Sequence, residues 1–178
     1  CVKLAINKLL KRKPDLIVSG INHGSNSSIN VIYSGTVAGA IEGALEGIPS
    51  IAFSLLDYSL DADFSESEVY IRDITEKVIR GRMDDGICLN VNIPKSIPGK
   101  DIKGFKICRQ AHANWEEEFD ERIDPKGRKY YWLTGKFVNY DEGKDTDEWA
   151  LSDHYISIVP VQFNLTAIKS IDPLKLLL

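Results

Sequence analysis

The feature that most constrains the fold is the stretch of residues 13–50, which has the pattern of a strand, a polar loop, a helix and a second strand. Leu16 to Val18 is a short apolar run preceded by Pro14, which is typical of a strand buried on both faces. In an open α/β sheet, ligands bind at the carboxyl ends of strands, beside helix N-termini. The residues after this strand are small or carry amides, and they form the predicted site: Ser19, Gly20, Asn22, Gly24, Ser25 and Asn26.

The helix predicted after this loop has one apolar stripe and a regular row of glycines. Ser34 is its expected N-cap, and Gly47 followed by Pro49 is its expected stop. Interior glycines each cost about 1 kcal/mol relative to alanine, so Gly39 and Gly43 indicate close packing of the helix backbone. The apolar stripe follows the helical period and consists of Val37, Ala40, Ile41, Ala44 and Leu45.

The elements that follow alternate between strand and helix as far as Pro94. Residues 50–56 predict a second buried strand, which completes a parallel, right-handed βαβ unit. Ser65 and Glu68 have the spacing of a capping box at the start of a further helix. Residues 87–93 alternate between apolar and polar side chains, as strands do. This order predicts a Rossmann-like, three-layer α/β domain over residues 1–94.

Residues 95–178 predict a β-rich C-terminal extension. Asp124-Pro-Lys-Gly127 matches a type I turn, with residues 119–123 and 128–133 as the arms of a hairpin. Asp145 is the expected cap of a short helix over residues 148–151, before a last strand. The aromatic residues 130–132 and the apolar end at 174–178 are too large to stay exposed, so both predict contact with another subunit.

Composition narrows the class of protein. A chain of 178 residues with 43% hydrophobic residues is typical of a globular domain, and no stretch is apolar enough to predict a membrane span. The net charge of −4 argues against a nucleic-acid polymer as partner. Cys1, Cys88 and Cys108 are odd in number and lack metal-ligand spacing, which indicates reduced cysteines of a cytoplasmic protein.

Two blocks of sequence carry a family resemblance. Ser19-Gly-Ile-Asn-His-Gly-Ser-Asn26 and Tyr33-Ser-Gly-Thr-Val-Ala-Gly-Ala-Ile-Glu-Gly43 resemble the hallmark of the SurE family of survival-protein nucleotidases. The resemblance covers most of the chain, because it extends through residues 89–94, 124–132, 146–147 and 155–160. It implies hydrolysis of nucleoside 5′- and 3′-monophosphates with a divalent cation, Mg²⁺ or Mn²⁺. It also implies a homodimer or homotetramer that forms through the β-rich extension.

The sequence departs from the family at its beginning. The family opens with a strand that ends in two adjacent aspartates, which hold the metal, and a serine further on adds another ligand. This chain has no counterpart of either, and Asp84-Asp85 has the setting of a solvated turn before Gly86. The expectation is therefore a chain without the family's N-terminal segment, and no catalytic residue is assigned.

The resemblance and the local chemistry together nominate five site residues. An amide oxygen is a hard, neutral ligand that suits Mg²⁺ or Mn²⁺, so Asn22 is the predicted metal ligand. The hydroxyls and N–H groups of Ser34, Gly35 and Thr36 predict phosphate binding at a helix N-terminus. Asn26 is predicted to orient the loop or to touch the substrate.

Purely structural roles stay open for three residues. Asn22 could serve only a left-handed turn, Ser34 could serve only as an N-cap, and His23 has the setting of a loop residue that shapes the rim of the pocket. The chain as a whole could bind an anion or nucleotide without hydrolysing it, since the acidic ligands are missing. It could also catalyse another reaction, because fold does not fix function.

Overall fold

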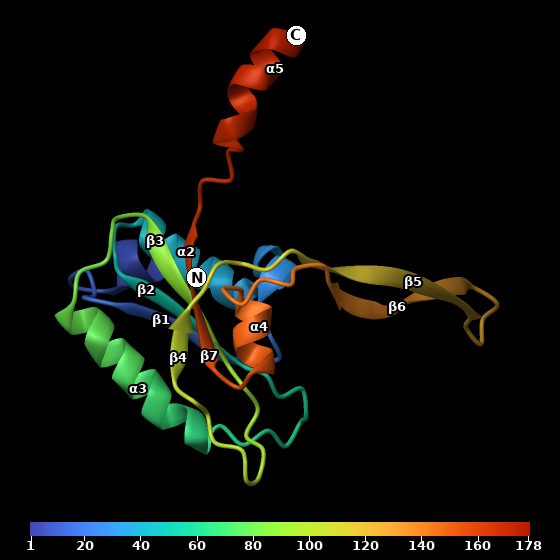
Figure 1. The fold of residues 1–178 in the computed structure, drawn as a ribbon, viewed down its shortest axis with the longest axis horizontal. Helices are drawn as coiled ribbons and strands as arrows, with labels where there is room; N and C mark the ends of the chain where they lie inside the picture. The colour runs from blue at the N-terminus through green and yellow to red at the C-terminus, as the bar shows by residue number, and fades with distance from the viewer.

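The computed structural model describes residues 1–178, apart from the side chain of Glu117. Its centre is a five-stranded sheet in the order β1-β2-β3-β7-β4 (Figure 1). β1, β2 and β3 are parallel, whereas β7 runs antiparallel to β3 and parallel to β4. The strands are β1 Ile17–His23, β2 Ser50–Leu55, β3 Ile87–Ile93, β4 Phe105–Ile107 and β7 Ile156–Gln162.

Helices cover both faces of this sheet, so the predicted three-layer α/β architecture is confirmed. α3, Ser65–Arg80, packs through Ile74 on the face that carries Ile51, Phe53 and Val91. α2, Gly35–Leu45, packs its alanines and Val37 on the other face. α4, Asp147–Ser152, lies on the same face as α2, since Val161 contacts the apolar clusters of both helices.

The glycine row of α2 does bring this helix close to the sheet. A Cβ at Gly39 would lie 2.8 Å from Ser19 Oγ, and a Cβ at Gly43 would lie 2.7 Å from Ile17 Cδ1 and still closer to Ser50 Oγ. Real Cβ atoms do not approach other atoms so closely, so alanine at either position would push the helix away. This close approach fixes the start of α2 beside β1 and thereby positions the predicted phosphate site.

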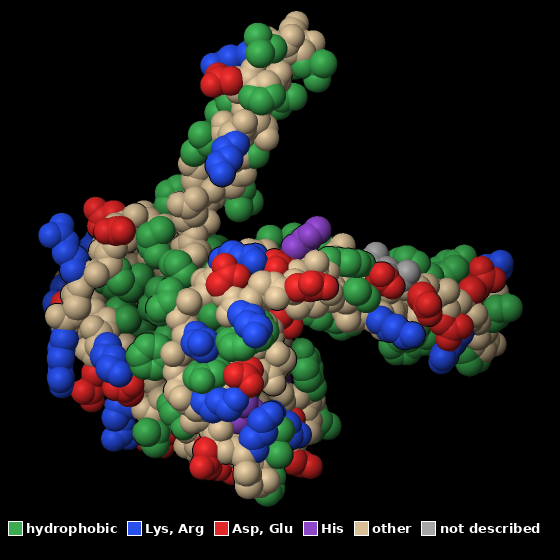
Figure 2. Space-filling view, viewed as in Figure 1, with side chains coloured by type: hydrophobic (Ala, Val, Ile, Leu, Met, Phe, Trp, Pro, Cys, Tyr) green, Lys and Arg blue, Asp and Glu red, His purple; other side chains and the backbone are tan. Residues whose placement is uncertain are grey.

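The hairpin and the C-terminal helix project from the sheet domain in different directions (Figure 1). The hairpin strands, β5 Ala113–Ile123 and β6 Lys129–Asn139, pair over their whole length and are longer than predicted. The predicted turn is present, with the Gly127 N–H donating to the Asp124 carbonyl over 2.9 Å. α5, Ile171–Leu177, follows the short helix η3, Ile168–Ser170. Apolar side chains are exposed along α5 and the hairpin (Figure 2).

Two predictions about individual elements were wrong. β1 is an edge strand, with Val18 47% exposed, so the apolar run at 16–18 is not buried on both faces. The capping box of α3 does not form, because Asp63 Oδ1 takes the Ser65 N–H over 2.8 Å instead.

A third correction concerns α4, which Thr146 rather than Asp145 caps. Thr146 Oγ1 accepts the Trp149 N–H over 3.2 Å, while the Asp145 carboxylate is taken up by Arg109. The chain's first elements are also short, with α1 over Val2–Leu4 and a wider helical turn, η1, over Ala5–Leu9.

The predicted division at residue 94 stays a proposal, and the structure adds one relevant fact. β4 and β7 lie beyond that boundary, yet they are strands of the same sheet as β1, β2 and β3. The two regions therefore share one sheet, and the hairpin and α5 project from it.

No helix in the described chain combines the length and apolar character needed to span a membrane.

Candidate functional site

A row of polar side chains crosses the sheet near the carboxyl ends of its parallel strands. Asn22 of β1 pairs in register with Ser54 of β2, which pairs with Asn92 of β3. Asn92 in turn lies opposite Ser157 of β7. Side chains at such positions point to one face of the sheet, which is here the face that α2 and α4 cover. The sheet register therefore brings together polar groups from four strands that are far apart in sequence.

Asn22, Asn26 and Ser54 form a closed hydrogen-bonded triangle. Asn22 Oδ1 accepts from Asn26 Nδ2 over 3.0 Å and from the Ser54 hydroxyl over 2.8 Å. Asn26 Nδ2 also donates to Ser54 Oγ over 2.7 Å. The Asn22 amide donates to the carbonyls of His23 and Gly24, over 2.9 and 3.1 Å. The Asn22 side chain thus bonds to the backbone at the turn of the loop and also to the side chains of Asn26 and Ser54.

Asparagines of β3 hold the backbone of the loop. The Asn26 N–H donates to Asn92 Oδ1 over 2.8 Å, and Asn90 Nδ2 donates to the Asn26 carbonyl over 2.8 Å. Asn26 is buried, and its contacts give it the loop-orienting role that was one of its two predicted roles. Contact of Asn26 with a substrate stays a prediction.

The N-terminus of α2 lies beside the same part of β1. Ser34 Oγ accepts the Val37 N–H over 3.0 Å, so the predicted N-cap is confirmed. A Cβ at Gly20 would meet Thr36 Cγ2 at 3.1 Å, which places Thr36 against the strand only two residues before Asn22. Gly35 is exposed, so its N–H group is accessible at the positive end of the helix dipole. The predicted phosphate ligands and Asn22 therefore lie at one end of the sheet.

Two carboxyl groups of α4 hold the far side of the loop, Asp147 buried and Glu148 half-buried. Asp147 accepts backbone N–H groups through both oxygens: Oδ2 from Ser28 over 2.8 Å and Oδ1 from Ala111 over 2.9 Å. Glu148 Oε1 accepts the Ser27 hydroxyl. Burial raises the pKa of both carboxyl groups above the usual values. The loop of residues 22–28 is thereby fixed from β2, β3 and α4 together.

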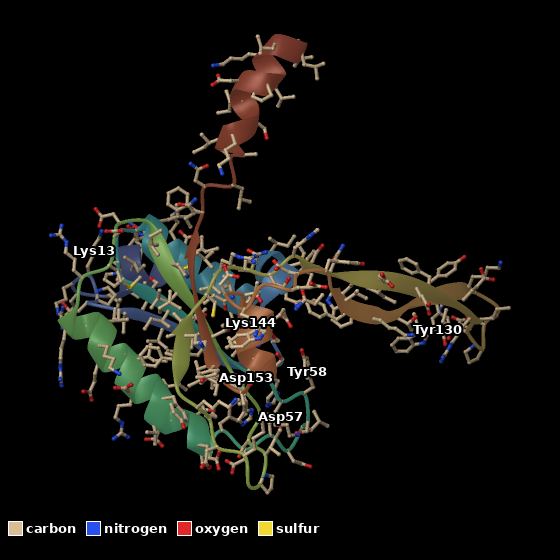
Figure 3. The ribbon with its side chains drawn as sticks, in the orientation of Figure 1. Lys13, Asp57, Tyr58, Tyr130, Lys144 and Asp153 are labelled. Carbon is tan, nitrogen blue, oxygen red and sulfur yellow. The ribbon has the colours of Figure 1, made fainter. Side chains whose placement is uncertain are left out.

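The segment after β2 covers the tip of the loop. Asp57 and Tyr58 lie on this segment (Figure 3). The Tyr58 hydroxyl accepts the Ser25 N–H over 3.1 Å, and the tyrosine ring lies on Gly24, where φ is +83°. Neighbouring Asp57 accepts the Ser59 hydroxyl and N–H, and these bonds, with the nearby Lys95 ammonium, lower the pKa of Asp57 to about 2. Asp57 is therefore an anion at neutral pH that holds this segment in place.

The three histidines make structural contacts, and His23 has the rim position that the sequence analysis favoured. The His23 ring stacks on Phe64 with centroids 5.0 Å apart, at the rim of the loop. His154 is buried, and its Nε2 lies 3.0 Å from the Lys100 carbonyl oxygen. His112 lies against Tyr140 at the base of the hairpin.

The described residues alone do not fit a divalent cation. Mg²⁺ is usually bound by one or two carboxylates together with substrate phosphate, and no group of three or more His, Cys, Asp or Glu in the described part of the chain could hold a metal. Asn22 offers one neutral oxygen, which already accepts two hydrogen bonds.

Several residues of the site were not found from the sequence. Ser54 lies in an apolar run that gave no signal, whereas Asn90 and Asn92 alternate with buried apolar residues, a pattern that could have marked them as inward-facing. Asp147 and Glu148 resemble any acidic start of a helix, so only their hydrogen bonds in the folded chain reveal their contacts with the loop.

Comparison with known proteins decides the family. The family profile described as Survival protein SurE matches residues 1–117. The chain belongs to the SurE family. A curated SurE relative from Christiangramia forsetii, named 5′-nucleotidase SurE, is 65% identical over 167 residues, which are 94% of this chain and 64% of the relative. A second SurE relative, from Flavobacterium psychrophilum and of the same name, is 60% identical over 98% of this chain and 68% of its own length. The chain thus spans about two thirds of these relatives.

A solved SurE structure supports the fold. The SurE protein of Aquifex aeolicus is 38% identical and superposes with a TM-score of 0.82, over 99% of this chain and 71% of that protein. The Rossmann-like α/β fold and the family resemblance are both confirmed.

Proposed function

We propose that this protein hydrolyses nucleoside 5′-monophosphates, and also 3′-monophosphates, to nucleoside and phosphate. The observation that carries the proposal is the position of the Asn22–Asn26–Ser54 triangle beside the N-terminus of α2, at the carboxyl ends of parallel strands. This is where α/β sheets bind ligands. The name 5′-nucleotidase, which both bacterial relatives carry, supports the same reaction.

In this proposal the chain's own residues bind and orient the phosphate. The N–H groups of Gly35 and Thr36, with the Ser34 hydroxyl, hold phosphate oxygens at the positive end of the α2 dipole. Because these donors are fixed by the close packing of α2 on β1, they stabilise charge that develops on the phosphate without reorganising. Asn22 would offer one neutral oxygen to Mg²⁺ or Mn²⁺ beside the phosphate oxygens, and it does not form a cation site by itself.

Phosphate release and chemical shifts test this proposal together. The protein should release phosphate from AMP with Mn²⁺ or Mg²⁺ and stop when EDTA is added. Inorganic phosphate should shift the amide NMR signals of residues 35–37. In Ser34→Ala these shifts should weaken, because the hydroxyl is lost, together with about 1 kcal/mol of stability from the lost N-cap. Shifts confined to surface lysines, or release of phosphate at an equal rate in Ser34→Ala, would contradict the assignment.

A second candidate function is binding of an anion or nucleotide without hydrolysis. The observation that favours it is that the described residues offer no clustered carboxylates to hold a cation near Asn22. Under this alternative, phosphate shifts the residue 35–37 signals, but no phosphate is released from AMP with either metal.

We also propose a homodimer or homotetramer that buries the hairpin and α5, in the cytoplasm. Supporting this, Tyr131 and Trp132 on β6 and Leu176 and Leu177 on α5 are all more than half exposed. Light scattering at micromolar concentration should give a mass of two or four chains, with Trp132 fluorescence shielded from a soluble quencher. A monomer with freely quenched fluorescence would contradict this arrangement.

A further inference from the structure

A cavity of about 250 Å³ lies on the side of the loop that faces the hairpin. Ser25 and Ser27 contribute to its wall, so it adjoins the proposed phosphate site through the same loop that carries Asn22 and Asn26. Its other walls come from the segment after β2, the base of the hairpin and the start of α4, namely Leu56, Tyr58, Trp115, Phe137 and Glu148, with Asn30 at the edge.

Three of the residues that line this cavity are aromatic, namely Tyr58, Trp115 and Phe137. Trp115 and Phe137 meet edge to face with centroids 5.4 Å apart, and the Trp115 indole N–H donates to Asn30 Oδ1 over 3.0 Å. That bond holds the indole in place while the side chain stays 42% exposed. Tyr58 stands on the opposite segment, held by its bond to Ser25. Flat, apolar rings at fixed positions are the surfaces on which nucleobases stack in proteins.

Glu148 is the one charged residue among those that line this cavity. Glu148 uses Oε1 for the Ser27 hydroxyl, and among the described residues no hydrogen bond is found for Oε2. An ionised carboxylate only accepts hydrogen bonds, so Oε2 selects a ligand that carries an N–H donor. The same negative charge repels phosphate, so the phosphate of a nucleotide belongs on the α2 side of the loop and the remainder of the molecule on this side.

We propose that this cavity is the nucleobase subsite, and that Glu148 selects bases that carry an exocyclic amino group, as adenine and cytosine do. The inference rests on the proposed function, since it supposes that the phosphate of a nucleotide lies at the start of α2. The amino group donates to Glu148 Oε2 while the ring stacks between Tyr58 and Trp115. A carbonyl oxygen at the same ring position meets the carboxylate with like partial charge and is disfavoured.

The test is a pair of ligands that differ by one amino group. AMP and purine riboside 5′-monophosphate, which lacks only the 6-amino group, are titrated into the intact protein by calorimetry in EDTA, so that no turnover is needed. A hydrogen bond to a charged group favours AMP about tenfold or more. A ratio of dissociation constants near one overturns the proposal without any variant.

Two variants separate contact with the base from support of the loop. Glu148→Met fills a similar volume without an acceptor and should bring the two dissociation constants within about twofold of each other. Ser27→Ala removes the hydroxyl that Glu148 accepts but keeps the carboxylate, and it should keep the preference for AMP. If Glu148→Met keeps the preference, or Ser27→Ala loses it equally, then Glu148 does not read the base.

The proposed function is judged by a different readout, the release of phosphate from AMP and from p-nitrophenyl phosphate with Mn²⁺. Release from both with equal binding of the two nucleotides leaves the nucleotidase and removes the base subsite. Preference for AMP without any release leaves the base subsite and removes the nucleotidase.

Discussion

Asn22→Ala is expected to lower the rate constant for AMP hydrolysis about a hundredfold and to raise the Mn²⁺ concentration needed for half-maximal rate. Loss of groups that orient a metal ligand already costs about 10–100-fold, and Asn22 is both the proposed ligand and the residue that holds the loop. Its amide makes two hydrogen bonds to the loop backbone, and its oxygen accepts from Asn26 and Ser54. Phosphate release over a Mn²⁺ titration measures both quantities.

Two further variants distinguish a role of Asn22 as a metal ligand from its role in holding the loop. Ser54→Ala removes one partner of the Asn22 oxygen but leaves the oxygen in place, so the rate should fall less than in Asn22→Ala. Asn7→Ala, at an exposed asparagine on η1, should behave like the unchanged protein. Full activity in Asn22→Ala would show that Asn22 is neither a ligand nor an essential part of the loop.

The sequence could predict those parts of the fold that local patterns determine. The stripe of Val37, Ala40 and Ala44 and the cap at Ser34 were sufficient for α2, because a helix needs only its own period and ends. The alternation over residues 87–93 was likewise sufficient for β3. Both predictions depend on residues that are close in sequence.

Position within the sheet could not be predicted from such patterns. The apolar run at residues 16–18 predicts burial, but whether a strand is central or at an edge depends on which other strands pair with it. In the structure β2 alone pairs with β1, and Val18 stays half exposed. The two predicted helix caps failed because each group has another partner. The Ser65 N–H donates to Asp63, two residues before it, whereas the Asp145 carboxylate pairs with Arg109, which is distant in sequence.

The candidate site likewise has one part that the sequence predicts and another part that it does not. Asn22, Asn26 and the start of α2 were predicted from one continuous stretch, and the structure places them together. Ser54, Asn92, Asp147 and Glu148 come from three other elements and contact the loop only through the register of the sheet and the return of the chain after the hairpin. These contacts join residues 28 to 121 positions apart, and such contacts leave no local pattern in one sequence.

Asp147 is the long-range contact whose loss should affect stability most. Its carboxylate accepts three backbone N–H groups, from Ser28, Ala111 and Glu148, at 2.8–2.9 Å, and the residue is 1% exposed. It thereby joins the site loop, the segment before the hairpin and the first turn of α4. An amide in place of the carboxylate keeps one accepting oxygen and points an NH₂ group at a backbone N–H.

Asp147→Asn is therefore expected to lower the free energy of unfolding by about 2 kcal/mol, because a buried donor left without an acceptor costs about 1–3 kcal/mol and the charge-assisted bonds are weakened. Urea unfolding followed by circular dichroism measures the change. Asp145→Asn is the matched control two residues earlier, where the exposed carboxylate pairs with Arg109 and an exposed ion pair contributes about 0–1 kcal/mol. Equal stability of the two variants would show that the Asp147 carboxylate does not hold the loop to α4. A larger loss in Asp147→Asn, with amide NMR shifts reaching Ser28 and the residues before it, would show that α4 holds the site from the opposite side to α2.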